Sequence, residues 1–176
     1  MANYISENAR KVTTTMLTEM KRKGQRISML TAYDYTMGTL VDQAGIDVIL
    51  VGDSASNVMA GNDTTLPITL DQMIYHARSV ARAAKHALVI CDMPFGTYQV
   101  CTGDALRAAV RIMAESGVDA VKLEGGEPVA HTVKALVQAG IPVCGHLGLT
   151  PQSVHVFGGF GLRAKEEAEA QQLVRD

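Results

Sequence analysis

The chain repeats one kind of junction, in which a helix-like stretch ends at a glycine and a strand-like run follows. The junction reads QAGIDV at residues 43–48, ESGVDA at residues 115–120 and QAGIPV at residues 138–143. A glycine in this place can adopt the left-handed conformation that ends a helix, and the β-branched residues around it favour a strand. The repetition predicts a series of βα units and argues against a sandwich or a helical bundle.

Five short runs read as the strands of these units. They are almost continuously apolar, which is typical of a parallel sheet that helices cover. Two architectures fit, a doubly wound open sheet and a (β/α)8 barrel; no Gly-x-Gly-x-x-Gly motif follows the first run, which weakens the dinucleotide-binding version of the open sheet. The runs are residues 27–34, 47–53, 87–94, 119–126 and 141–148.

Helix start signals lie between these runs. Thr69 with Asp71 predicts the start of one helix, Asp104 predicts the start of another, and Pro128 suits the first turn of a third. We also expect a helix over about residues 6–23, before the first strand.

Composition narrows the class of protein. In the 176 residues, 47% are hydrophobic, 19% are charged and the net charge is -2, which gives no basic surface for nucleic acid or membranes. No apolar run approaches the roughly 20 residues that cross a bilayer, and residues 1–12 lack the layout of a signal peptide. We therefore expect a cytoplasmic protein. The widely spaced Cys91, Cys101 and Cys144 indicate neither a disulfide framework nor a zinc site.

Each strand-like run delivers a polar or titratable side chain near its carboxyl end. Parallel strands end at the same edge of a sheet, and in βα barrels that edge holds the active site. Side chains alternate along a strand, so Lys122 and Glu124 point one way while Val121 and Leu123 point the other. A single aspartate after a strand can also simply cap the next helix, and this alternative fits Asp34 best. The polar residues are Asp34, Asp53, Ser54, Asp92, Lys122, Glu124 and His146.

Three of the four carboxylates in this set would repel one another if they met at the same edge. Asp53, Asp92 and Glu124 at one barrel mouth call for a cation, and oxygen ligands favour magnesium. Lys122 adds a positive charge for a carboxylate or enolate oxygen, so the pattern suggests a metal-chelated α-keto acid. Cys144 and His146 could in principle form a nucleophilic pair, but no third group that would orient them is apparent.

Six blocks of sequence resemble the ketopantoate hydroxymethyltransferase family, also called 3-methyl-2-oxobutanoate hydroxymethyltransferase. The likeness runs in order from about residue 10 to about residue 160. It implies a (β/α)8 TIM barrel of the phosphoenolpyruvate/pyruvate type, with about five βα units in this chain. The blocks are TAYDY (31–35), LVGDS (50–54), TTLPIT (64–69), DMPFGTY (92–98), VKLEGG (121–126) and CGHLGLTPQSV (144–154).

The resemblance also implies a reaction and a set of roles. The family transfers a hydroxymethyl group from 5,10-methylenetetrahydrofolate to 3-methyl-2-oxobutanoate through a Mg²⁺-stabilised enolate, on the route to pantothenate and coenzyme A. It further implies small-molecule substrates, no nucleic-acid or membrane partner, and large ring-like homo-oligomers. The matching positions are Asp53, Asp92 and Glu124 for the metal, Asp53, Ser54, Asp92 and Lys122 for the keto acid, and His146 as an assisting group near the substrate.

The likeness weakens towards the end of the chain. After FGGF the family continues with a Val-Gln-Gly-Arg-like segment, whereas residues 161–170 read GLRAKEEAEA. The family's general-base glutamate would lie beyond Asp176, so we expect residues 1–176 to be one barrel domain truncated at its C-terminal end, inactive by itself. Two alternatives stay open: a non-catalytic fragment that binds metal or keto acid, and another magnesium-dependent keto-acid lyase of the same barrel group.

Overall fold

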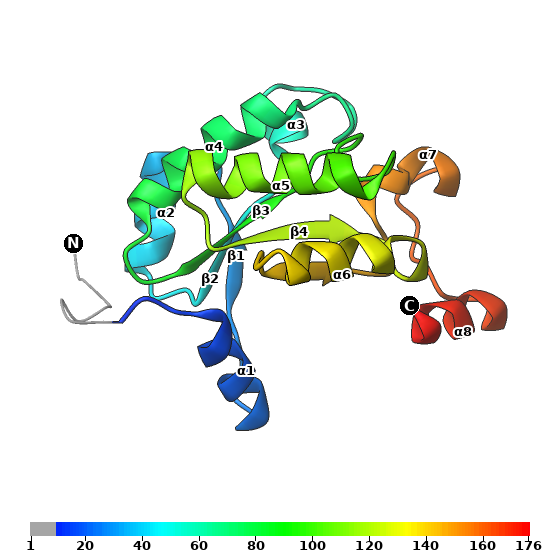
Figure 1. Cartoon of the computed structure of the whole chain (residues 1–176), viewed down its shortest axis with the longest axis horizontal. Coiled ribbons are helices and arrows are strands. Elements are labelled where there is room, and N and C mark those ends of the chain that lie inside the picture. The colour runs from blue at the N-terminus through cyan, green and yellow to red at the C-terminus, as the bar shows by residue number, and fades with distance from the viewer. Residues whose placement is uncertain (1–9) are drawn as a thin grey trace.

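A computed structural model describes residues 10–176 and places one parallel five-stranded sheet at the centre of the chain (Figure 1). The strand order is β1-β2-β3-β4-β5, the same as the order in sequence. A doubly wound sheet would reverse direction at a switch point, so the sequential order decides for consecutive units of a (β/α)8 barrel. The strands are β1 (Met29–Thr31), β2 (Val48–Val51), β3 (Leu88–Asp92), β4 (Ala120–Glu124) and β5 (Val143–His146).

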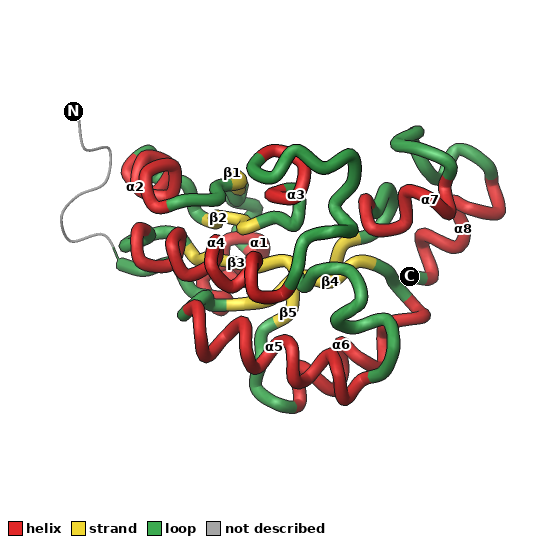
Figure 2. The backbone as a smooth tube through the Cα atoms, turned by 90° about the horizontal axis from the view of Figure 1, so that it is seen from above, coloured by secondary structure: helices red, strands yellow, loops and turns green. Residues whose placement is uncertain are grey.

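Helices form an arc around the outer side of this sheet (Figure 2). Helices α2, α4, α5 and α6 each pack against the next, while α1 lies apart from this arc and α7 and α8 lie at the far end of the molecule. No helix among residues 10–176 is both long enough and apolar enough to span a membrane. The helices are α1 (Thr14–Arg22), α2 (Tyr35–Gln43), α3 (Ala55–Val58), α4 (Leu70–Ala83), α5 (Thr102–Ser116), η1 (Glu127–Val129), α6 (Ala130–Gln138), η2 (Pro151–Ser153), α7 (Val154–Phe157) and α8 (Glu167–Arg175).

Strand alternation divides the core in two. Val121 and Leu123 join the large cluster between the sheet and the helices, as the alternation predicts. The opposite, inward face carries a smaller cluster, against which Leu17 of α1 packs. Lys122 and Glu124 point to that inward side, although both are at most 8% exposed. The inward cluster is Val12, Val48, Leu88, Ile90 and Ala120.

Most local signals act where they are expected. Thr69 and Gln72 form a reciprocal capping box at the start of α4, and the junction glycines Gly45, Gly117 and Gly140 all have φ between 79° and 84°. Pro128 lies in the first turn of η1. These helix starts and helix ends therefore lie where the sequence predicts them.

All five strands are shorter than the runs that predicted them, and two helix starts also differ from the expectation. Helix α5 begins two residues before Asp104, because Cys101 has an extended backbone and its Sγ accepts a hydrogen bond from Asp104 N at 3.4 Å. Strand β1 is shorter than residues 27–34, since Asp34 caps α2 by accepting from Met37 N at 2.9 Å. The capping alternative for Asp34 is thus confirmed. Helix α1 starts only at Thr14, and residues 6–9 of the expected helix lie outside the described part of the chain.

Candidate active site at the carboxyl edge of the sheet

Strand register brings the predicted polar residues together in pairs. Asp92, the last residue of β3, lies beside Lys122 of β4, and Glu124 lies beside His146, the last residue of β5. Asp53 lies two residues after the end of β2, and its backbone N–H donates to Asp92 Oδ2 at 3.0 Å. All five therefore meet at one edge, as predicted, whereas Asp34 serves the helix cap described above.

Lys122 neutralises part of the acidic charge. Its Nζ lies 2.6 Å from Asp92 Oδ1 and 3.9 Å from Glu124 Oε1, and the side chains are nearly excluded from water. Burial by itself lowers the pKa of Lys122, but the neighbouring carboxylates, Asp92 foremost, outweigh it and hold the pKa above its usual value. Lys122 is thus a cation at neutral pH.

The two aspartates remain short of counter-charge. Burial, followed by the charge of Asp92, raises the pKa of Asp53 to about 6. Burial also raises the pKa of Asp92, although Lys122 works against it. One ammonium group does not compensate for this many carboxylates in a dry site, and a further positive charge would stabilise them.

Glu124 has partners at both of its oxygens. His146 Nδ1 lies 3.3 Å from Oε1, and the backbone N–H of Gln152 donates to Oε2 at 2.9 Å. Thus Glu124 orients His146, whose side chain is 34% exposed. Burial raises the pKa of the nearby Cys144 thiol, which opposes the thiolate that a Cys–His nucleophile needs.

The turn after β2 presents Ser54 to the same site. Ser54 Oγ lies 2.8 Å from Tyr33 OH, so the two hydroxyls share a hydrogen bond. A Cβ at Gly52 would lie 2.7 Å from Ser54 Oγ and 3.7 Å from Asp92 Oδ2. A residue without a side chain at position 52 therefore lets the serine and the carboxylate approach each other.

A match to a known family accompanies this geometry. The sequence model of the ketopantoate hydroxymethyltransferase family matches residues 11–176. This chain belongs to that family. Proteins named 3-methyl-2-oxobutanoate hydroxymethyltransferase are 64% identical in Bacteroides thetaiotaomicron and 61% identical in Porphyromonas gingivalis, each over all 176 residues. The chain spans 64% of the length of each of these two relatives.

Solved structures with the same architecture support the fold assignment. A phosphonopyruvate hydrolase complex with oxalate and Mg²⁺ aligns with a TM-score of 0.62 at 13% identity, covering 94% of this chain and 69% of that one. A 2,3-dimethylmalate lyase of the PEP mutase/isocitrate lyase superfamily aligns with a TM-score of 0.56 at 19% identity, covering 76% and 50%. These neighbours confirm the expected βα-barrel architecture.

The oxygen donors of this family member fit a magnesium ion. Mg²⁺ binds through one or two carboxylates and completes its shell with water and substrate oxygens, and the adjacent Asp53 and Asp92 offer two. Asp92 Oδ1 is buried and pairs with the Lys122 ammonium at 2.6 Å. Within residues 10–176, no group of three or more His, Cys, Asp or Glu residues forms a ready metal cage. Among the described residues, Asp53 and Asp92 are the carboxylates that could hold the ion directly, whereas both oxygens of Glu124 already have partners.

Gln152 is the site residue that sequence reasoning missed. It follows β5 in η2, is 7% exposed, and its side chain contacts Asp53, Met93 and Tyr98. A polar residue directly after Pro151 in an apolar block was the available signal, but nothing in the sequence shows which partners lie around it.

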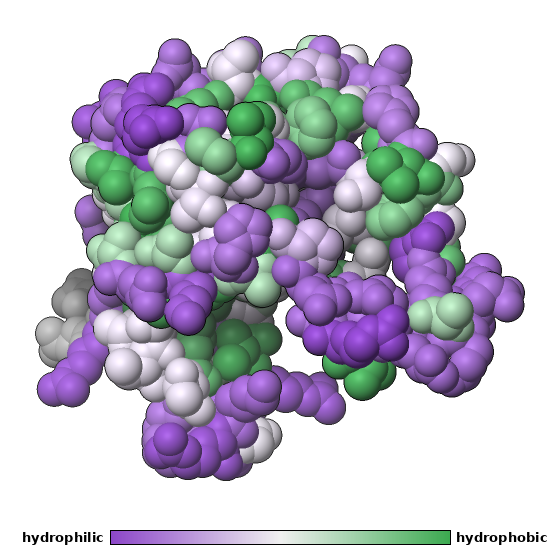
Figure 3. Space-filling view, turned by 45° about the vertical axis from the view of Figure 1, so that its right-hand side comes forward, coloured by the Kyte–Doolittle hydropathy of each residue, from purple (hydrophilic) through white to green (hydrophobic). Residues whose placement is uncertain are grey.

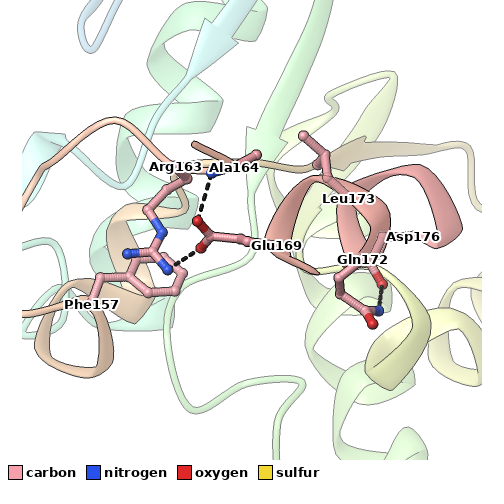
Figure 4. A pocket seen from close by; sticks show the side chains of 8 residues that line it. Phe157, Arg163, Ala164, Glu169, Gln172, Leu173 and Asp176 are labelled. Carbon is pink, nitrogen blue, oxygen red and sulfur yellow. Dashed lines mark hydrogen bonds and ion pairs between the residues drawn. The ribbon is translucent and has the colours of Figure 1, made fainter. Parts of the chain in front are cut away.

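The segment that departs from the family pattern packs against α7 and α8. Arg163 stacks over the ring of Phe157 at 4.1 Å and pairs with Glu169 of α8, which also accepts from Ala164 N at 2.7 Å (Figure 4). With Gly148 and others, these residues line a pocket of about 180 Å³. The segment therefore has contacts of its own and packs against α8.

Proposed function

We propose that this protein transfers a hydroxymethyl group from 5,10-methylenetetrahydrofolate to 3-methyl-2-oxobutanoate, giving 2-dehydropantoate for pantothenate and coenzyme A biosynthesis. The observation that carries the proposal is the buried cluster of Asp53, Asp92 and Lys122 at the barrel mouth. It occurs in a chain 61–64% identical to proteins named for this activity.

Asp53 and Asp92 would hold the magnesium ion, with Glu124 in an outer position. When bound, the ion supplies Lewis-acid polarisation of the keto acid, which makes the proton on C3 easier to remove. The two aspartates are already desolvated by the fold, so they have little hydration left to lose on binding a cation.

Lys122 and Ser54 would bind the oxygens of the keto acid. The Lys122 ammonium would stabilise the negative charge that develops as the C3 proton leaves, and Ser54 would offer a hydroxyl donor. His146 is partly exposed and held by Glu124, so it can pass a proton between the site and solvent. The base that takes the C3 proton is not assigned to any residue from 10 to 176.

Calorimetry tests the binding half of the proposal. 3-Methyl-2-oxobutanoate should bind this chain when Mg²⁺ is present, and binding should be lost with a chelator. Asp92→Asn should abolish it, whereas Asp63→Asn, the same change at an exposed loop carboxylate, should not. Equal binding by both variants would contradict the assignment of Asp92.

Product analysis tests the reaction. Formation of 2-dehydropantoate should require the folate donor, and NMR can follow it together with deuterium exchange at C3. Cleavage of a keto acid without folate would favour a magnesium-dependent lyase instead. Binding without exchange or product would favour a non-catalytic chain that only binds metal and keto acid.

A further inference from the structure

The side chain of Gln152 makes four hydrogen bonds inside the mouth. Its Nε2 donates to Asp53 Oδ2 at 2.8 Å and to Met93 O at 2.9 Å. Its Oε1 accepts from Tyr98 OH at 2.6 Å and from Gln99 Nε2 at 3.0 Å. A primary amide has two donor hydrogens and two acceptor lone pairs, so the hydrogen-bonding capacity of this side chain is fully used.

These partners permit only one orientation of the amide. Turning it over would place Oε1 against the Asp53 carboxylate and the Met93 carbonyl, which are both acceptors, and would remove the acceptor from Tyr98 OH. Each buried group left without a partner costs about 1–3 kcal/mol. Tyr98 is itself fixed, because its OH accepts from Glu124 N at 3.2 Å.

The Gln152 amide therefore holds one oxygen of the Asp53 carboxylate and leaves the other oxygen free. Gln152 engages Oδ2 of Asp53, and among the described residues no hydrogen bond is made to Oδ1. Its own backbone N–H donates to Glu124 Oε2 at 2.9 Å. One residue in η2 thus fixes acidic side chains that come from the ends of β2 and β4.

We propose that Gln152 is a positioning residue that holds the Asp53 carboxylate in its ligating orientation, and that Tyr98 fixes the direction of the Gln152 amide. The proposal rests on the proposed function, since it deepens the role of the same site. Groups that orient a metal ligand typically contribute about 10–100-fold to metal affinity. A polar side chain that merely filled the core would not affect this affinity selectively.

Two variants test the chain of contacts. Gln152→Met keeps a side chain of similar length without its hydrogen bonds, and it should weaken Mg²⁺ binding by roughly 10-fold or more in calorimetry. Tyr98→Phe alters neither Asp53 nor Gln152 and removes only the tyrosine hydroxyl, so it should weaken Mg²⁺ binding by a smaller factor. Asp63→Asn, at an exposed loop carboxylate outside this network, serves as the control, with Mg²⁺ affinity within about twofold of the unaltered chain.

Coupling between the variants separates positioning from general destabilisation. Tyr98→Phe should cost less Mg²⁺ affinity in the Gln152→Met background than in the unaltered chain, because its effect passes through Gln152. If both single variants bind Mg²⁺ as tightly as the unaltered chain, the proposal is wrong. Should Gln152→Met fail to fold, Tyr98→Phe alone decides.

A spectroscopic measurement keeps this inference distinct from the proposed function. The side-chain NH₂ signals of Gln152, identified by their loss in Gln152→Met, should exchange slowly with solvent and shift in Asp53→Asn but not in Asp63→Asn. Failure of the unaltered chain to bind Mg²⁺ would overturn the proposed function and leave this readout intact. Rapidly exchanging signals that ignore Asp53→Asn would overturn the positioning role itself.

Discussion

Three ionisable side chains at the barrel mouth share a space from which water is nearly excluded. Asp53, Asp92 and Lys122 are 3%, 4% and 8% exposed. Removing charges from water costs more than one ion pair usually returns, so this cluster is a poor device for stability. Its arrangement instead suits a site in which a bound cation supplies the missing positive charge.

The raised pKa of Asp53 predicts an unusual pH dependence of stability. The folded pKa of about 6 lies above the ordinary value of 3.8, so between these values the folded state retains a proton that the unfolded state has lost. The Asp53 contribution therefore falls as pH rises from about 4 to about 6, by about 3 kcal/mol in total. Urea unfolding in a chelator should show this loss relative to Asp53→Asn, which lacks the titration.

Bound Mg²⁺ should counter the loss of stability at higher pH, because it stabilises the ionised form of Asp53. A cation binds the ionised carboxylate, so its affinity should weaken as pH falls below about 6 and protons compete for Asp53. The difference in free energy of unfolding between the unaltered chain and Asp53→Asn is measured in the chelator. If this difference stays constant from about pH 4 to about pH 6, the raised pKa is wrongly assigned to Asp53.

Lys122 predicts a stability effect as well as a binding effect. Packing alone would tolerate Lys122→Met, since the lengths are similar. The ion pair at 2.6 Å changes this expectation, because the variant leaves Asp92 buried without its counter-charge. We expect a loss of about 3 kcal/mol in the free energy of unfolding, together with loss of keto-acid binding in calorimetry.

The double variant Lys122→Met with Asp92→Asn distinguishes the two roles. It should regain most of the lost stability, because no lone charge remains, and still bind neither Mg²⁺ nor keto acid. Normal keto-acid affinity in Lys122→Met would show that Lys122 is only structural.

At the scale of the elements, helices α1, α2, α4 and α5 begin where a side chain accepts a hydrogen bond from a free backbone N–H group. Thr69 does this for α4 and Asp34 for α2, and both residue types are favoured caps. Helix α5 uses the Cys101 thiol, whose sulfur is a weak acceptor, at 3.4 Å. The start of α5 is therefore less well stabilised than that of its neighbour α4.

Cys101→Ser should strengthen this start. A serine hydroxyl is a better acceptor in the same extended geometry, so we expect a gain of about 0.5–1 kcal/mol in unfolding free energy. Thermal or urea unfolding measures it, with Cys101→Ala as the control that should lose stability. The Cys101 side chain makes its hydrogen bonds with Asp104 and not with the mouth residues. Mg²⁺ affinity should therefore be unchanged in Cys101→Ser, and a changed affinity would show that the start of α5 affects the site.

At the scale of the whole molecule, the described sheet ends at β1 and β5. All three residues of β1 are exposed, with Met29 at 42% and Leu30 at 51%. Figure 3 shows apolar surface (green) in the recess at the lower centre of its view, between two polar protrusions. Exposed apolar edge strands offer both side chains and open backbone groups to another chain.

This edge predicts self-association of the chain. We expect light scattering to report a mass above the 18.8 kDa of one chain, rising with concentration. Leu30→Lys should shift the equilibrium towards the monomer, because a charge at an edge strand opposes pairing. Arg26→Lys, a nearby change that keeps its charge, is the matched control. A monodisperse monomer with slowly exchanging β1 amides would contradict the prediction.

The features that could be predicted from sequence are those set by neighbours along the chain. Strand alternation put Val121 and Leu123 on the helix side and Lys122 and Glu124 on the inward side, because backbone pleating depends on adjacent residues alone. The junction glycines and the Thr69 cap follow from equally local geometry. The strand ends indicated the mouth residues, and the blocks of family likeness then implied the barrel and the roles of these residues.

What the tertiary structure decided depends on contacts between distant residues. The strand order chose the barrel over the doubly wound sheet, and the register set Lys122 against Asp92. The bond from Gln152 to Asp53 joins residues 99 positions apart. Such pairs arise when strand ends and loops pack at a common edge, where distances depend on sheet twist and register. No local pattern of residues carries that information, which is why Gln152 appears as part of the site only in the folded chain.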